Sequence, residues 1–198
     1  MAFDADIERI NKYLLSRQAA FDSIMAASRS IIMESGRIIT QLHNGDIKNA
    51  VKKFGELSSS VEKLKGIDKG FEYYTLQSYQ EYAEAAIMLE VKVHDSIPSI
   101  SKLGVREEAY LFGLMDAVGE LKRDVLESLR KDDIEKAESL FAKMNTIYDS
   151  TRHIRFAEAI LPGFRRKQDT ARIQLENAGS EILMFKNASG RLHASQNE

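Results

Sequence analysis

Near the middle of the chain, the sequence reads Leu76-Gln77-Ser78-Tyr79-Gln80-Glu81-Tyr82-Ala83-Glu84-Ala85-Ala86-Ile87-Met88-Leu89. This segment contains no glycine, no proline and only one β-branched residue, Ile87, a composition that predicts an α-helix. Glu81 and Glu84 are three residues apart, which places both side chains on one helix face, one turn apart. Five apolar residues follow Glu84 directly. Because acidic side chains are seldom buried unless they are paired or bind a metal ion, these glutamates are candidate site residues.

A second strongly apolar segment, residues 109–121, carries Asp116 near its centre and Glu120 one turn later. Aspartate is a poor residue for a helix interior, because its short side chain competes for local backbone groups. Two helices that each place acids among apolar residues could meet as a carboxylate cluster, which suits a hard cation such as Mg²⁺. The alternative for Asp116 is a buried cap or an ion pair, for example with Arg123. Arg123 lies two turns along the same face and could instead bind a substrate phosphate beside the metal ion.

The composition predicts a soluble, all-α protein. The 198 residues suffice for one domain with a full core, and 43% hydrophobic with 29% charged residues is ordinary for a globular chain. Cysteine is absent, which excludes disulfides, thiolate metal sites and a cysteine nucleophile. The start lacks a signal-peptide pattern and no apolar run approaches the ~20 residues of a membrane span, so we expect a cytoplasmic location without membrane contact. The net charge of −2 neither predicts nor excludes a nucleic-acid partner.

The chain divides into about six to seven helices, which we expect to form a single-domain bundle over residues 1–186. Residues 187–198 form a polar tail that we expect to be disordered. The main expected helices are approximately Asp4–Leu42, Ile47–Lys65, Phe71–His94, Val105–Arg130, Asp133–Asp149 and Pro162–Phe185. A longest internal loop is expected at 95–100. The first helix would be about 57 Å long, too long for a compact domain of this size, so it either kinks or extends to another subunit.

Short polar sequences mark the ends of these helices. Gly45 and Asp46 predict the end of the first helix and the N-cap of the second. Asp132 and Glu135 predict a capping box for the fifth. Pro162 fits the first turn of the last helix.

Several familiar chemistries find no support in the sequence. A four-helix di-iron site needs Glu-x-x-His on two helices, but none of the four histidines has a glutamate three residues before it. There is no Walker loop, no GxGxxG and no GxSxG. Basic clusters, any of which usually forms a solvated face, occur at Lys52-Lys53, Lys122-Arg123, Arg152-His153-Arg155 and Arg165-Arg166-Lys167.

Several motifs together resemble a known family. They are Ser28-Arg29-x-Ile31, Glu34-Ser35-Gly36-Arg37-Ile38-x-x-x-Leu42-His43, Gln80-Glu81-Tyr82-Ala83-Glu84-Ala85, Tyr110-Leu111-Phe112-Gly113-Leu114-Met115-Asp116-Ala117-Val118-Gly119-Glu120-Leu121 and Gly179-Ser180-Glu181-Ile182. With these motifs, the chain resembles the translin and translin-associated factor X (TRAX) family along most of its length. It departs from the TRAX pattern at Ala83, where that pattern has valine.

The resemblance implies the TRAX branch, because plain translin lacks the acids that this chain retains. It implies that Glu81, Glu84 and Asp116 bind Mg²⁺, with Mn²⁺ as an alternative, and form the catalytic triad of an endoribonuclease. Glu120 would orient these ligands without itself binding the metal ion. It also implies a helical bundle assembled into a hollow homo-oligomer, an octamer in this family, that encloses single-stranded RNA, with single-stranded DNA as an alternative. Arg37 and Arg123 are the candidate nucleic-acid contacts nearest the matching motifs.

Two other functions stay open at this point. One is a non-catalytic oligomer of translin type that binds single-stranded RNA or DNA. The other is a structural helical oligomer without a ligand. Incubation of the purified protein with labelled single-stranded RNA, in Mg²⁺ and in EDTA, is the experiment that best separates the nuclease from these alternatives.

Overall fold

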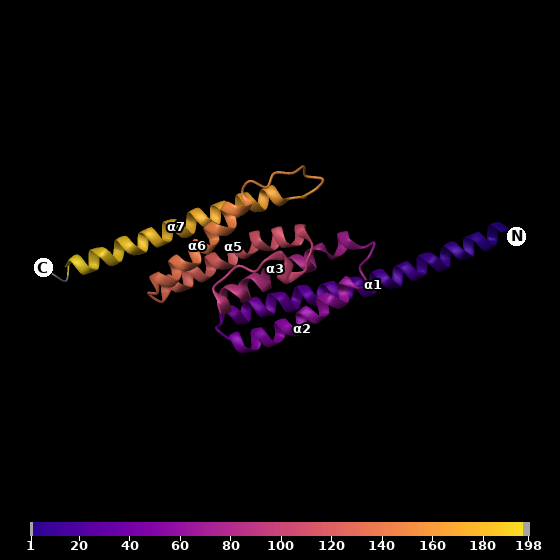
Figure 1. Cartoon of the computed structure of the whole chain (residues 1–198), viewed down its shortest axis with the longest axis horizontal. Helices are drawn as coiled ribbons and strands as arrows, with labels where there is room; N and C mark the ends of the chain where they lie inside the picture. Colours follow the sequence, from indigo (N-terminus) through magenta and orange to yellow (C-terminus); the bar gives the residue numbers. More distant parts are fainter. Residues whose placement is uncertain (1, 196–198) are drawn as a thin grey trace. The chain divides into compact units, whose positions relative to one another are not determined.

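The computed structural model describes residues 2–195, with side chains as far as Ser189. Within this range the chain forms seven α-helices and no strand, which confirms the predicted all-α class and helix number (Figure 1). The helices are α1 (Ala2–His43), α2 (Ile47–Lys65), α3 (Glu72–His94), α4 (Ile100–Leu103), α5 (Glu107–Arg130), α6 (Ile134–Thr151) and α7 (Phe164–Ser195). In the described part of the chain, no helix combines the length and apolarity needed to cross a membrane.

The helices fall into two compact units, Met1–Tyr82 and Ala83–Glu198. The boundary lies inside α3, so α3 contributes its first half to one unit and its second half to the other. A single domain over residues 1–186 stays a prediction.

In the first unit, α1 packs against α2. The turn between them follows the predicted signals: Gly45 has φ +78°, and the Asp46 side chain accepts a hydrogen bond from the Asn49 backbone N–H at 3.4 Å. These features end one helix and cap the next. The buried apolar residues that α1 and α2 contribute are Ile24, Ile31, Ile38, Ile39, Leu42, Ala50, Leu57, Val61 and Leu64.

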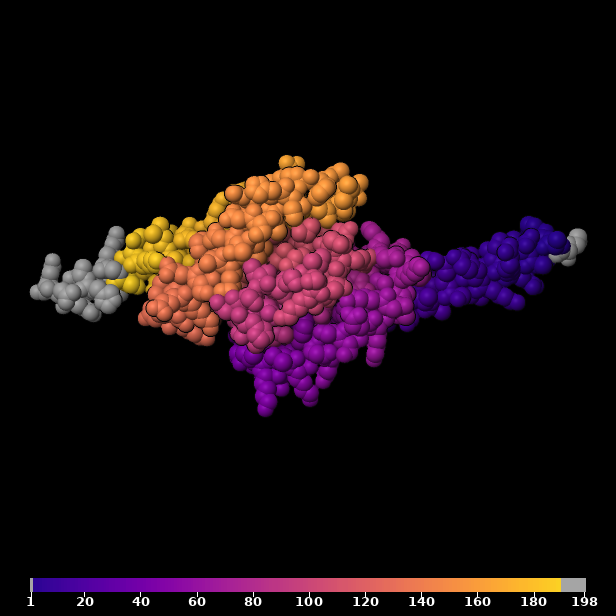
Figure 2. Space-filling model, in the orientation of Figure 1, coloured from indigo at the N-terminus to yellow at the C-terminus, as the bar shows by residue number. Residues whose placement is uncertain are grey.

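The first part of α1 behaves differently. Residues 2–20 are all exposed, and Figure 2 shows this indigo segment standing clear of α2. Its exposed large apolar residues are Phe3, Ile7, Ile10, Tyr13, Leu14 and Leu15. At 42 residues, α1 is about 63 Å long, and only its second half contributes to the core of its own unit.

In the second unit, α5 packs against both α6 and α7, and α6 packs against α7. The residues that carry this core include Met115, Val118, Leu121, Val125, Leu140, Met144, Ile147, Phe164, Ala171 and Ala178. A nearly buried ion pair joins the second half of α3 to α5, since Lys92 Nζ lies 2.8 Å from Asp124 Oδ1.

Two predictions about the connections between helices are wrong. The longest helix-free connection in the described chain is 152–163, between α6 and α7, and not 95–100, where the short helix α4 already begins at Ile100. The N-cap of α6 is Asp133, whose side chain accepts a hydrogen bond from the Lys136 backbone at 3.1 Å, and not Asp132. Asp132 instead has φ +64° and closes the end of α5, where the Asp133 N–H bonds back to the Ser128 carbonyl.

The bounds of α7 also differ from expectation. Pro162 lies in the turn before α7, since Gly163 has φ +78° and the helix begins at Phe164. The helix continues to Ser195 and does not end near Phe185, because no proline interrupts the polar sequence that follows. The predicted tail is therefore helical from 187 to 195, and 196–198 lie outside the described residues.

Candidate carboxylate site

Glu81 and Glu84 both lie on α3, one helical turn apart, as the sequence predicts. Glu84 is only 8% exposed, whereas Glu81 is half-buried. The residues that flank Glu84, Ala83 and Ala85, are fully buried, and the apolar residues 86–88 follow them. The acidic side chain of Glu84 is thus held inside an apolar stretch, where the charged carboxylate needs a cation or hydrogen-bond donors.

Asp116 lies on α5 and is held by a partner that the sequence does not indicate. Lys167, from the first turns of α7, forms an ion pair through Nζ with Asp116 Oδ1. The Asp116 side chain is 25% exposed and that of Lys167 is 33% exposed. The Lys167 ammonium also lies 5.9 Å from the centre of the Phe112 ring, within reach of a cation–π interaction. Lys167 therefore places a positive charge directly at the third predicted ligand.

Glu120 and the two candidate arginines form ion pairs on their own helices. Arg123 lies 3.9 Å from Glu120, and its side chain is 64% exposed. Arg37 pairs with Glu34 on α1. Because such exposed pairs at i,i+3 contribute little to stability, both arginines could exchange their carboxylate for a phosphate at small cost. The roles predicted for Glu120, Arg37 and Arg123 stay predictions.

The donor chemistry of the predicted triad suits magnesium. Carboxylate oxygens are the ligands that Mg²⁺ prefers, and the chain offers no thiolate that would favour a softer metal. Taken separately, neither unit contains, within the described residues, three or more His, Cys, Asp or Glu side chains grouped closely enough to hold a metal ion. Glu81 belongs to the first unit, and Glu84 and Asp116 belong to the second. The triad as a single site therefore stays a prediction.

Two other polar groups on α3 and α5 have partners and pKa shifts of ordinary origin, with which the candidate acids can be compared. Glu90, also on α3, has both carboxylate oxygens 2.7 Å from Lys102 Nζ, and this hydrogen-bonded ammonium lowers the pKa of Glu90 below its usual value. Tyr110 donates a hydrogen bond to the Pro98 carbonyl at 2.7 Å, and burial raises the pKa of its phenol.

A relative by sequence and several by structure were found. The chain is 30% identical over 184 residues to an uncharacterized protein of Methanocaldococcus jannaschii, an alignment that covers 91% of this chain and 82% of that protein. No protein-family model matches.

Solved structures of C3PO share the fold along nearly the whole chain. The complex of AfC3PO with duplex RNA superposes with a TM-score of 0.85 at 27% identity and covers 92% of this chain and 97% of its own. AfC3PO alone gives a TM-score of 0.83 at the same identity and coverage. Apo-NeC3PO gives 0.83 at 24% identity, covers 90% of this chain and 96% of its own, and supports the fold. Together with the motifs quoted above, these matches show that the chain belongs to the translin/TRAX family.

Proposed function

We propose that this chain binds RNA and cleaves it with the help of a divalent metal ion, using Glu81, Glu84 and Asp116. The observation that carries the proposal is the burial of Glu84, 8% exposed among apolar residues and one helical turn from Glu81. A carboxylate in such a place costs folding free energy, and binding a metal ion is one of the few roles that offsets this cost.

Family membership supports RNA as the polymer. AfC3PO, at 27% identity, has been solved with duplex RNA, while the family resemblance implies single-stranded RNA. Both forms share the phosphodiester backbone that basic residues contact, so the experiment below includes both. Exposed arginines such as Arg37 and Arg123 fit this contact.

In the proposed cleavage, the acids and Lys167 would have different roles. Glu81, Glu84 and Asp116 would supply the carboxylate oxygens that hold the metal ion. When bound there, Mg²⁺ or Mn²⁺ neutralises charge on the phosphoryl oxygens and favours attack by water on the phosphodiester. Lys167 holds Asp116 in the free protein and, once released, places an ammonium beside a phosphate.

A homo-oligomer, an octamer by resemblance, is part of the same proposal. The exposed apolar residues of α1, from Phe3 to Leu15, fit an interface between copies better than a solvated surface. Sedimentation of the purified protein tests this part separately, and a monomer at micromolar concentration would contradict it.

A second function, RNA binding without cleavage, is favoured by one observation. The ammonium of Lys167 already neutralises Asp116. A lysine at this place can substitute for a metal ion electrostatically without activating water. In that case the acids contribute to structure and the protein only binds RNA.

Incubation with labelled RNA separates the two functions. Single-stranded and duplex RNA are each incubated with the wild type and with the Glu81→Gln/Glu84→Gln/Asp116→Asn variant, in Mg²⁺, in Mn²⁺ and in EDTA. We expect cleavage by the wild type in metal only and none by the variant. Binding without cleavage under all conditions would support the second function, and cleavage by the variant at the wild-type rate would refute the carboxylate site.

A further inference from the structure

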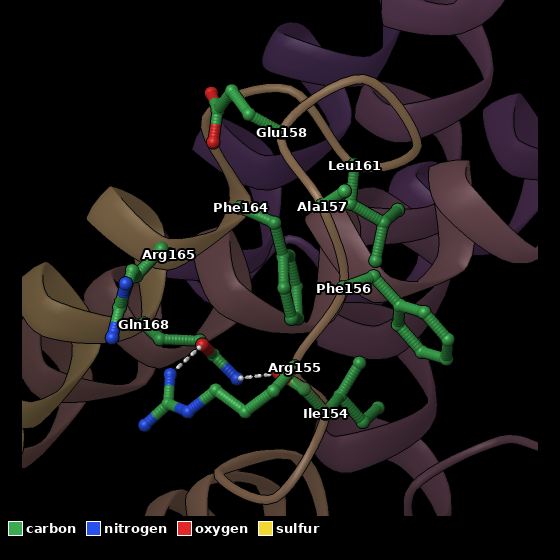
Figure 3. A pocket seen from close by; sticks show the side chains of 9 residues that line it. All are labelled: Ile154, Arg155, Phe156, Ala157, Glu158, Leu161, Phe164, Arg165 and Gln168. Carbon is green, nitrogen blue, oxygen red and sulfur yellow. Dashed lines mark hydrogen bonds between the residues drawn. The ribbon is translucent and has the colours of Figure 1, made fainter.

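The second unit contains a cavity of about 620 Å³ beside the connection between α6 and α7. Figure 3 shows the side chains that line it, from the connecting loop and from the first turns of α7. A volume in this range suits a ligand the size of a nucleotide and is much larger than a single phosphate needs. Its lining residues are Ile154, Arg155, Phe156, Ala157, Glu158, Leu161, Phe164, Arg165 and Gln168.

The polar side of the cavity carries two arginines that form no ion pair with an acid among the described residues. Arg155 donates a hydrogen bond from Nη1 to Gln168 Oε1 at 2.7 Å. Gln168 is 3% exposed and is fixed in turn, because its Nε2 donates to the Thr151 carbonyl at 2.8 Å. This neutral support orients the guanidinium of Arg155 without cancelling its charge. The Arg165 side chain forms no hydrogen bond or ion pair within the described part of the chain.

Most other arginines of the described chain differ in this respect, although Arg17, Arg29 and Arg166 also have no carboxylate partner there. Six arginines pair with a carboxylate three or four residues away on the same helix or at its end, namely Arg9, Arg37, Arg123, Arg130, Arg152 and Arg172. The two arginines of the cavity therefore concentrate uncompensated positive charge at one place.

The one acid among the lining residues, Glu158, does not neutralise this charge. The Glu158 carboxylate accepts a hydrogen bond from the Gly163 backbone N–H, and in Figure 3 it points to the end of the loop opposite Arg155. The first turn of α7 contains no acid, although the positive end of a helix dipole favours acids there. An anion in the cavity would remove this electrostatic conflict.

The other side of the cavity is apolar and aromatic. Phe164 is 3% exposed and packs edge-on against Phe112 at 5.6 Å between ring centres, which fixes its position. Phe156 is 66% exposed and offers a free ring face to a ligand. Flat aromatic and guanidinium groups of this kind stack on nucleobases.

We propose that this cavity binds a nucleoside monophosphate group, with the phosphate on Arg155 and Arg165 and the base against Phe156. The group comes either from a free nucleotide or from one nucleotide of an RNA strand, since both present the same phosphate and base. The proposal uses none of the carboxylates on α3 and α5 and therefore stands apart from the proposed cleavage.

Calorimetric titration of the full-length protein with AMP, adenosine and inorganic phosphate tests the ligand class. We expect saturable binding of AMP at millimolar concentration or below, and weaker binding of both fragments. Arg165→Gln should weaken AMP binding by about tenfold or more, because a charge-assisted hydrogen bond is lost. Phe156→Ala should weaken the binding of AMP and leave that of phosphate unchanged.

The matched control is Arg172→Gln, which removes an arginine of α7 that pairs with Glu176 outside the cavity. It should bind AMP as the wild type does. Arg165→Gln removes no side-chain hydrogen bond or ion pair within the described chain, so a thermal unfolding midpoint close to that of the wild type is expected. Arg155→Lys provides a second variant. It keeps the positive charge but loses the planar set of N–H donors of the guanidinium, so it should also weaken the binding of AMP. Absent AMP binding, binding unchanged in Arg165→Gln, or phosphate binding as tight as AMP would each overturn the proposal.

Titration with a labelled single-stranded RNA in EDTA identifies the source of the nucleotide. If AMP competes with the RNA and Arg165→Gln weakens both, the cavity holds a nucleotide of the strand. If the RNA binds Arg165→Gln as it binds the wild type while AMP is lost, the ligand is a free nucleotide. Because EDTA prevents metal-dependent cleavage, neither result depends on catalysis, and a failed cleavage assay would bear on the carboxylates alone.

Discussion

The acids of α3 and α5 and the arginines of the α6–α7 cavity balance their charges in opposite ways. Glu84 is buried among apolar residues of a helix, so its charge must be met from within the protein or by a bound cation. Arg165 lies at a cavity wall without an acidic partner in the described chain, so its charge can be met by a ligand from outside. The two proposed sites therefore differ in where the compensating charge would come from: a bound cation or the protein itself for Glu84, and a bound anion for Arg165.

The two regions meet in the sequence Arg165-Arg166-Lys167. Arg165 lines the cavity, whereas Lys167, two residues later, reaches Asp116 on α5. The first turn of α7 therefore contributes to both proposed sites. Variants that change one site and leave the other intact can test whether the two are independent.

The largest effect is expected from the acids. Glu81→Gln, Glu84→Gln and Asp116→Asn each preserve shape and remove a charge that a hard cation needs, so each should reduce metal-dependent RNA cleavage by at least about a hundredfold. Combining them should add little, because residues of one site fail together. Single-turnover cleavage rates measure this, and AMP binding at the cavity should not change.

RNA binding by the same variants should persist or tighten, since negative charge near the phosphates is removed. The metal-free protein should remain folded, with an unfolding midpoint at or above that of the wild type, because desolvated charges are neutralised. Equal cleavage, binding and stability in all variants would contradict a role of these acids in a metal site.

Lys167→Met tests whether Asp116 binds a metal ion, because it removes the ammonium that pairs with this carboxylate. Without the ammonium at Asp116, a divalent cation meets no competing charge, and Mn²⁺ should bind several-fold more tightly. Electron paramagnetic resonance of free Mn²⁺ measures this affinity without any enzymatic assay. The control is Lys186→Met, which removes a lysine of the same helix that pairs with Glu138. Unchanged Mn²⁺ affinity in Lys167→Met would show that Asp116 does not bind the metal ion.

Arg37→Gln and Arg123→Gln test the exposed basic residues predicted from sequence. If each arginine contacts one phosphate, each variant should weaken RNA binding for all sequences and reduce the slope of log K against log salt by about one. Filter binding in EDTA over a series of salt concentrations gives this slope. Arg130→Gln, which breaks a comparable pair with Glu127, is the control, and a slope like that of the control would exclude the tested arginine as a contact.

The smallest effect concerns Glu90, the ion-paired reference acid of α3. The Lys102 ammonium lowers the pKa of Glu90 in the folded state, so the pair stabilises the fold above the unfolded pKa of about 4.3 and loses this effect as the pH falls through the lowered value. Lys102→Met should lose roughly 0.5 kcal/mol at pH 7, since the lysine is largely exposed. Urea unfolding at pH 7 and pH 3 should show this difference shrink in acid; a constant difference would contradict it.

The sequence by itself determined those features that depend on neighbouring residues: helix bounds, helix caps and the helix face on which a side chain lies. The bounds of α2 agree with the predicted Ile47–Lys65, and Asp46 caps it as expected, because caps and helical periodicity depend on residues within four positions. The same spacing rule placed Glu81 and Glu84 on one face of α3, and the apolar run after Glu84 indicated its burial. The N-cap of α6 was missed by one residue, since the end of α5 competes for Asp132.

Contacts between distant segments were decided by the tertiary structure. Lys167 and Asp116 are 51 residues apart, and no sequence periodicity relates them. The cavity likewise depends on the path of the loop after α6, which brings Arg155 beside Gln168 of α7. From the sequence alone, both basic clusters predicted only a solvated face. The surroundings of Lys167 and Arg165 differ because the packing of α7 against α5 and α6 directs Lys167 to an acid and leaves Arg165 at a cavity wall.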